Sequence, residues 1–324
     1  MIVLRLRPLA AILVVCLAAA LAAGQTAKTA PAASKTYTPS RTPDGQPDLQ
    51  GFWTNSTITP LERPKELAGK QFFTQAEALE YQRRMAQPAG EGAPGLQAGS
   101  SINDFWFERG KVVGDLRTSL IVDPPDGKIP YTPEAQKRLA ARAQERRQHP
   151  SDGPEDRSLA ERCIVWPVSG PPMMPTGYNS NYQIIQAPGY VVILVEMIHE
   201  ARIVPLDARP HVSSGIREWM GDSRGHWDGN TLVVDTTNFT PKFGFRGAGE
   251  NLHVTERFTR LDAETLRYQF TVDDPATFTK PWTAEIPMRR TQGPIYEYAC
   301  SEGNYALGDI LAGARADEKK GPSK

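Results

Sequence analysis

Between residues 182 and 299, hydrophobic and polar residues alternate in short runs, which is the pattern of strands that bury one face. Turn-forming glycine, proline, asparagine and aspartate separate these runs. The clearest separator is Asp228-Gly229. An Asp-Gly pair suits a two-residue type I′ turn, because both central residues of that turn need a positive φ. This part of the chain therefore predicts one antiparallel hairpin after another.

Barrel strands are expected at 182–186, 190–195, 202–206, 222–227, 230–237, 253–261, 265–272, 282–289 and 295–299. The run 190–195 is apolar without a break, which predicts burial on both faces. An antiparallel meander of this length either closes on itself or leaves edge strands open. We therefore predict a mainly β fold, an antiparallel meander that closes into a lipocalin-like barrel. A twisted sandwich, or an open sheet wrapped by the N-terminal segment, is the alternative.

Two short N-terminal helices are predicted before the barrel. The capping-box spacing of Thr74 and Glu77 predicts a helix at 75–86. Thr132, followed directly by proline, predicts the start of a second helix, which Pro150 ends.

The first 24 residues have the pattern of a secretory signal peptide, with two arginines before an apolar run and small residues after it. A retained N-terminal anchor is the alternative. Cleavage predicts a periplasmic or secreted protein with no stable membrane span. The remaining parts are expected to be a disordered tether (25–45), a strand and helix segment packing on the barrel (46–160), the β-barrel domain (161–312) and a disordered tail (313–324).

The bulk composition limits the partners and the compartment. Basic and acidic side chains number 37 each, and no basic stripe is present, which argues against nucleic acid and anionic membrane surfaces as partners. Only Cys163 and Cys300 lie outside the leader. In an oxidising compartment such an isolated pair predicts a disulfide, with two unrelated buried thiols as the alternative.

Acid–base chemistry has candidates within the β region. They are His199, Glu200, Arg202, His253 and Glu256. Alternation along a strand places Glu256 on the opposite face from His253. Glu256 then either faces solvent or points into a mostly apolar cavity, where burial would raise its pKa and suit it to proton transfer. No known metal-ligand spacing, phosphate loop or dinucleotide fingerprint is present, so no metal and no cofactor is predicted.

Aromatic residues supply a second set of candidates. A few of them at a barrel mouth would form a pocket for a small molecule. The predicted ligand-binding residues are Trp219, Trp227, Asp235, Phe243, Phe245 and Trp282. The glycine-rich loop 240–251 is the expected lid.

Several blocks of sequence occur together in an order that resembles a large family of secreted bacterial proteins. The blocks are residues 117–127 (RTSLIVDPPDG), 199–202 (HEAR), 207–211 (DARPH), 221–235 (GDSRGHWDGNTLVVD), 255–258 (TERF) and 297–300 (EYAC). The chain departs from the pattern at Ala208, where glycine is usual, and at Asn230, where aspartate is usual. The resemblance covers nearly the whole mature chain and assigns no catalytic residue.

Three functions follow from these patterns. The first is a periplasmic or secreted β-barrel that binds a small, partly apolar organic ligand in its cavity. The second is a cofactor-independent acid–base enzyme, such as a lyase, isomerase, cyclase or hydrolase, that uses the His, Glu and Arg groups in the same cavity. The third is an envelope-associated interaction protein.

Overall fold

A computed structural model describes residues 37–86, 108 and 110–320 of the chain. The predicted signal peptide lies outside the described residues. The helices are α2 (Gln75–Ala86), α4 (Pro133–Gln148) and α5 (Tyr305–Lys320), with short 3-10 turns η2 (Lys65–Leu67), η3 (Pro154–Asp156), η4 (Met197–His199) and η5 (Phe245–Gly247). The strands are β1 (Gly51–Thr54), β2 (Ile121–Asp123), β3 (Asn181–Ala187), β4 (Tyr190–Val195), β5 (Ala201–Pro205), β6 (Asp222–Asp228), β7 (Thr231–Thr237), β8 (His253–Arg260), β9 (Thr265–Asp273) and β10 (Trp282–Arg290).

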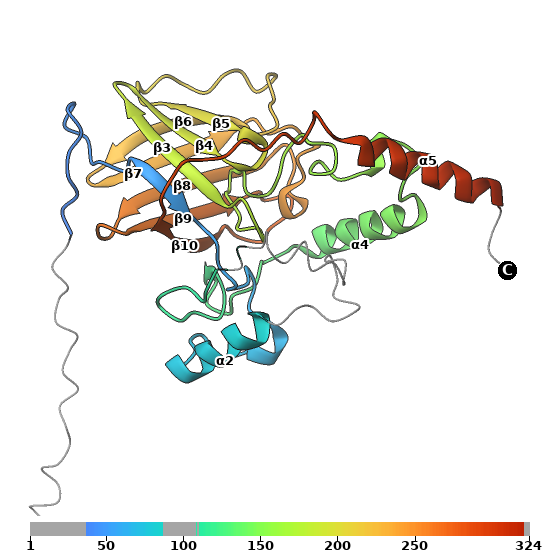
Figure 1. Cartoon of the computed structure of the whole chain (residues 1–324), viewed down its shortest axis with the longest axis horizontal. Coiled ribbons are helices and arrows are strands. Elements are labelled where there is room, and N and C mark those ends of the chain that lie inside the picture. Colours follow the sequence, from blue (N-terminus) through green and yellow to red (C-terminus); the bar gives the residue numbers. More distant parts are fainter. Residues whose placement is uncertain (1–36, 87–107, 109, 321–324) are drawn as a thin grey trace, which may run out of the picture. The chain divides into compact units, whose positions relative to one another are not determined.

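The described strands form one antiparallel sheet (Figure 1). Their spatial order is β5-β4-β3-β1-β10-β9-β8-β7-β6, and β2 pairs with β10 beside this path. Two hairpin meanders, β3 to β5 and β6 to β10, are thus joined by β1, which pairs with β3 on one side and β10 on the other. The sheet is a nearly closed antiparallel barrel, which confirms the predicted mainly β barrel. The likeness of this barrel to lipocalins stays a prediction.

The barrel closes where β5 and β6 face each other without appearing as hydrogen-bonded neighbours in the sheet. A Cβ added to Gly225 of β6 would lie 2.7 Å from a Leu206 methyl carbon and 2.8 Å from one of Val204. Residue 225 must therefore be glycine for the side chains of the β5 segment to pack this closely on the β6 backbone. We call this junction the seam.

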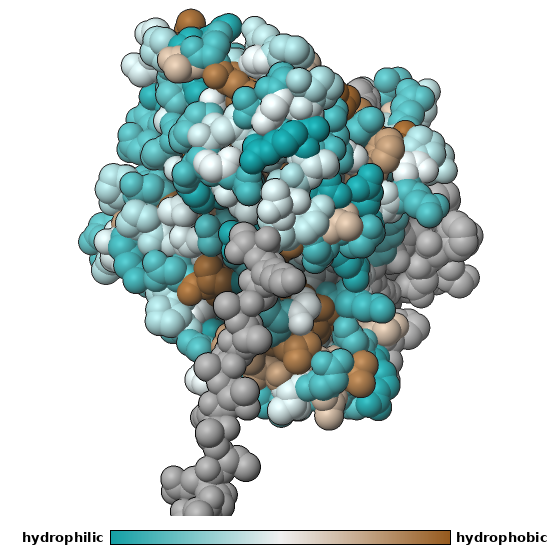
Figure 2. All heavy atoms as spheres, turned by 90° about the vertical axis from the view of Figure 1, so that its left-hand side faces the viewer, coloured by the Kyte–Doolittle hydropathy of each residue, from teal (hydrophilic) through white to brown (hydrophobic). Residues whose placement is uncertain are grey.

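Alternation along most strands separates a packed interior from a polar exterior. In β8 and β9 every second residue is buried, and the same holds for the first eight residues of β10. The largest fully buried side chains of the described residues include Trp53, Tyr182, Tyr268, Phe258, Phe270 and Trp282. Figure 2 shows one face of the molecule, on which hydrophilic side chains predominate and hydrophobic ones gather in small groups.

The sheet differs from the predicted meander in four places. Strand β1 comes from the N-terminal segment yet belongs to the barrel itself. Residues 295–299, expected to be a strand, are not assigned to one. Strand β4 buries only alternate residues, because its other face lies on the outside of a single-layer barrel. The two central turn residues are Gly229 and Asn230, and only Gly229 has a positive φ, which is the type II′ pattern rather than the predicted type I′.

The structure describes parts of both ends that were expected to be disordered. Helix α5 occupies much of the expected tail. Arg41 of the expected tether contacts the barrel, where its guanidinium nitrogen donates to the Asn230 side-chain oxygen at 2.9 Å. In the part of the chain that the structure describes, no helix is long and apolar enough to cross a membrane.

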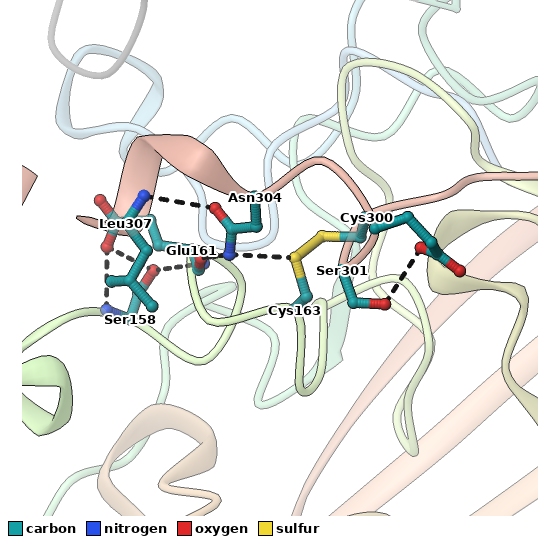
Figure 3. The surroundings of a disulfide bond; sticks show 8 residues. Ser158, Glu161, Cys163, Cys300, Ser301, Asn304 and Leu307 are labelled. Carbon is teal, nitrogen blue, oxygen red and sulfur yellow. Dashed lines mark hydrogen bonds between the residues drawn. A yellow bond between two sulfur atoms is a disulfide. The ribbon is translucent and has the colours of Figure 1, made fainter. Parts of the chain in front are cut away.

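The predicted disulfide between Cys163 and Cys300 is confirmed, and two separate thiols are excluded (Figure 3). The two α-carbons lie 5.6 Å apart, although 137 positions separate them in the sequence. The Asn304 amide nitrogen lies beside the bond and donates to the Glu161 carbonyl oxygen at 2.8 Å. The disulfide therefore fixes the chain just before α5 to the loop that precedes β3.

Candidate functional site

Two of the five predicted acid–base residues meet inside the barrel. Arg202 of β5 and Glu256 of β8 form a two-pronged ion pair, with nitrogen to oxygen distances of 3.1 and 2.5 Å. Both side chains are almost fully buried, at 4% and 0% exposure. Burial works against the charged guanidinium, but the charge and hydrogen bonds of Glu256 outweigh it and raise the pKa of Arg202. Of the two alternatives for Glu256, facing solvent or pointing inward, the structure shows the second. The Glu256 carboxylate is paired there with the Arg202 guanidinium.

Buried tyrosines complete this interior network. The Tyr268 hydroxyl donates to Glu256 Oε1 at 2.7 Å and accepts from the Met173 backbone nitrogen at 2.8 Å. The Tyr182 hydroxyl donates to the Val168 carbonyl at 2.9 Å and accepts from the Asn55 amide at 2.8 Å. Burial raises the pKa of both tyrosines far above the ordinary value, so they stay neutral hydrogen-bonding groups. The network ties the segment 168–173 to the barrel wall.

Several of the predicted aromatic ligand residues pack against the hydrophobic core or against other rings. Trp282 is fully buried and stacks with Phe245 at a ring-centre distance of 6.3 Å. Phe243 of the expected lid stacks on Phe239 at 5.4 Å. Trp227 packs against the same core from the inner side of β6, and Trp219 is half-buried in the loop before β6. Of the predicted ligand rings, only that of Trp282 is fully buried in the barrel interior, where the sequence predicted the ligand.

A second polar cluster lies on the outer face of β6, β7 and β8. Asp235 accepts from two histidines: His211 Nε2 lies 2.9 Å from its Oδ1, and His253 Nε2 contacts its Oδ2. The other ring nitrogen of His211 lies 2.8 Å from Asp222, which also pairs with Arg224 at 2.6 Å. Both ring nitrogens of His211 therefore contact a carboxylate, one from β6 and one from β7. We call these five residues the outer histidine cluster.

Within this cluster, the contact between Asp235 and His253 stabilises the charged form of each of the two residues. The hydrogen bond to Asp235 raises the pKa of His253 above its ordinary value against the effect of burial, and the charges of Asp235 and Asp273 add to the rise. Burial alone would raise the pKa of Asp235, but the hydrogen bonds from His253 and then His211 outweigh it and lower the pKa. The predicted ligand residue Asp235 thus belongs with the histidines, on the opposite side of the barrel wall from Trp282.

The five acid–base candidates are divided between separate places. Arg202 and Glu256 are inside the barrel, and His253 is outside. His199 ends η4, and Glu200 begins the return into β5, where its carbonyl accepts from the Val195 backbone nitrogen at 2.8 Å. The structure therefore does not bring all five residues together in one cavity.

An open cavity lies on the outer face of β1, β3 and β10, with a volume of about 350 Å³. Its floor includes Asn181, Thr54 and Arg289, which are register partners across the three strands. The chain after β10, Glu108 and Gly110 also line the cavity. We call this the outer pocket. A further cavity, of about 320 Å³, lies beside the disulfide.

Two carboxylates line the outer pocket. Glu196 is 4% exposed and accepts from the side-chain amides of Asn179, at 2.6 Å, and Asn181, at 2.9 Å. Glu108 has a raised pKa, first because of burial and then because of the charge of Glu196, while a hydrogen bond with Asn181 opposes the rise. A buried carboxylate beside one with a raised pKa, both in a cavity, is typical of a binding or catalytic site.

Sequence reasoning missed this pocket because its parts are distant in the chain. The pattern gave one signal: Glu196 interrupts the apolar run that ends at Ile198. The rest depends on β1 lying between β3 and β10, a non-local pairing that alternation does not reveal.

Comparisons with models of known protein families and with curated proteins find no match for this chain, so the resemblance to the family of secreted bacterial proteins stays a prediction. Among the described residues, no group of three or more His, Cys, Asp or Glu side chains has a geometry that would hold a metal ion.

Proposed function

We propose that this protein is a secreted or periplasmic binding protein, which takes a small, partly apolar organic molecule into the outer pocket. The proposal moves the ligand from the barrel interior, where aromatic rings and the Arg202–Glu256 pair occupy the space, to the outer face. The observation that carries it is a cavity of about 350 Å³ that combines apolar walls with a buried carboxylate. Cavities of this size suit small organic molecules.

Ligand binding has better geometric support than acid–base catalysis by the five candidate residues. Glu256 accepts three hydrogen bonds, two from Arg202 and one from Tyr268, and it is fully buried. Removing a proton from a substrate would require breaking this network. The barrel pair is better suited to holding the segment 168–173 in place.

The proposed location rests on two observations. The leader has the pattern of a secretory signal peptide. The Cys163–Cys300 disulfide is of the kind that persists in oxidising compartments.

The test is native mass spectrometry of the protein purified from the periplasm or medium of its own host. We expect a bound small molecule in the wild type. Thr54→Trp places an indole on the pocket floor, so this variant is expected to lose the bound mass. Gln269→Trp, on the outer face of β9 and away from the pocket, is the matched control and should retain it. Ligand-free wild-type protein, or a ligand that remains on Thr54→Trp, contradicts the proposal.

A further inference from the structure

The acidic end of the outer pocket holds negative charge without a basic partner. Glu196 is held by two neutral amides, and the described residues contain no ion pair to it. An ionised carboxylate in a buried place is costly unless opposite charge compensates it. Burial is the main cause of the raised pKa of Glu108, and the charge of Glu196 adds to the rise. This end of the pocket therefore favours a positively charged group.

The opposite end of the outer pocket carries a positive charge. Arg289 lines the pocket from β10, and no ion pair to it is found in the described part of the chain. Asn181, Thr54 and Arg289 are successive register partners on β3, β1 and β10. Two strand spacings therefore separate the backbone positions of Asn181 and Arg289, which is about 10 Å. An arginine fork at this end favours a carboxylate or a similar oxyanion.

Apolar side chains line the same cavity as the two charged ends. Phe52 on the floor and Pro294, Ile295 and Tyr296 in the wall line the same cavity. The wall is fitted closely to the floor, since a Cβ added at Gly293 would lie 2.5 Å from the Phe52 ring. A ligand with a ring or short hydrocarbon between its charges would contact these apolar side chains.

We propose that the outer pocket binds a zwitterionic organic molecule, with an amine at the Glu108 and Glu196 end, an anionic group at Arg289 and an apolar body between them. This inference rests on the proposed function and names the class of its ligand. The amine supplies the missing counter-charge for the buried Glu196, and the anionic group pairs with the Arg289 fork.

The test uses four probes with the same ring: 4-(aminomethyl)benzoic acid, benzylamine, benzoic acid and benzyl alcohol. Calorimetry or NMR titration of the whole protein measures their dissociation constants. We expect the zwitterion to bind about tenfold more tightly than either singly charged probe, and benzyl alcohol to bind most weakly. Thr54→Trp should abolish binding of all four.

Single charge-removing variants assign the two ends. Glu196→Gln should remove the advantage of the amine and leave benzoic acid binding unchanged, whereas Arg289→Gln should do the reverse. Glu108→Gln is the second acidic variant, and it keeps the test decisive if Glu196→Gln fails to fold, because Glu108 is not buried in the core.

The outcomes separate this inference from the proposed function. If benzyl alcohol binds in the pocket as tightly as the zwitterion, or the charge variants change nothing, the pocket binds small molecules but the zwitterion assignment is wrong. If no probe binds and the native protein is also free of ligand, both proposals fail.

Discussion

At the scale of single residues, the outer histidine cluster makes the stability of the fold fall both at high pH and at low pH. The pKa of His253 is raised above 6.5, so the contribution of its protonated form is complete below pH 6.5 and is lost as pH rises through the raised value. The pKa of Asp235 is lowered below 3.8, so the contribution of its ionised form is present above pH 3.8 and is lost as pH falls through the lowered value. The pair therefore stabilises the fold most between these two ordinary values.

We expect Asp235→Asn to lower the pKa of His253 towards 6.5, because the main cause of the rise is the hydrogen bond to the ionised carboxylate. An NMR titration of the histidine ring protons measures this pKa. The same variant should lose more stability, relative to the wild type, at pH 5.5 than at pH 8.5. Asp228→Asn is the control, since Asp228 lies on the same face but pairs with Arg257. An unchanged pKa of His253 in Asp235→Asn would contradict the prediction.

The sequence predicted which face of a strand a residue occupies, but it did not predict which residues contact each other across the barrel. Alternation placed Glu256 and His253 on opposite faces of β8, and the burial pattern agrees. The partner of Glu256 is Arg202, 54 positions away, and only the closure of the barrel brings them together. In the same way, Asp235 was grouped with aromatic ligand residues because the sequence does not say which outward-facing side chains are neighbours.

At the scale of elements, the seam between β5 and β6 depends on side-chain packing. Gly225 permits this packing because its missing Cβ leaves room for Val204 and Leu206. Val204 is fully buried, so it has little freedom to move aside.

We expect Gly225→Ala to lower the free energy of unfolding by about 1–3 kcal/mol, the usual cost of overpacking. Urea denaturation followed by tryptophan fluorescence measures the change. Gly249→Ala is the matched control, because an added Cβ there meets nothing within 4 Å. Equal stability of the two variants would show that the seam is not tightly packed.

The sequence predicted elements well where pattern and pairing are local. Each strand of the two meanders was expected close to its observed position. The segment 295–299 has the composition of a strand but runs along the pocket towards Cys300. The segment 46–160 was expected to contribute a strand that packs on the barrel, but the place of β1 between β3 and β10 was not expected, because sequence patterns carry no information on distant strand pairs.

At the scale of the whole molecule, the Cys163–Cys300 bond closes a loop that contains β3 to β10. The bond also anchors the chain that forms one wall of the outer pocket, since residues 291–296 lead directly to Cys300. Breaking it should affect both stability and binding.

We expect reduction, or the double variant Cys163→Ala/Cys300→Ala, to lower the free energy of unfolding by about 2–5 kcal/mol, because the unfolded chain regains loop entropy. Urea unfolding with and without reductant measures the loss. The double variant should not respond to reductant, which serves as the control. An unchanged urea midpoint after complete reduction would contradict this prediction.

The seam also bears on how the protein behaves among other copies of itself. A β-sheet edge normally exposes backbone donors and acceptors that can recruit a strand from another chain. Here the two end strands lie against each other, so each blocks the approach to the other's unpaired backbone groups. A substitution that forced them apart would therefore expose two templates for intermolecular pairing at once, and aggregation would accompany the loss of stability.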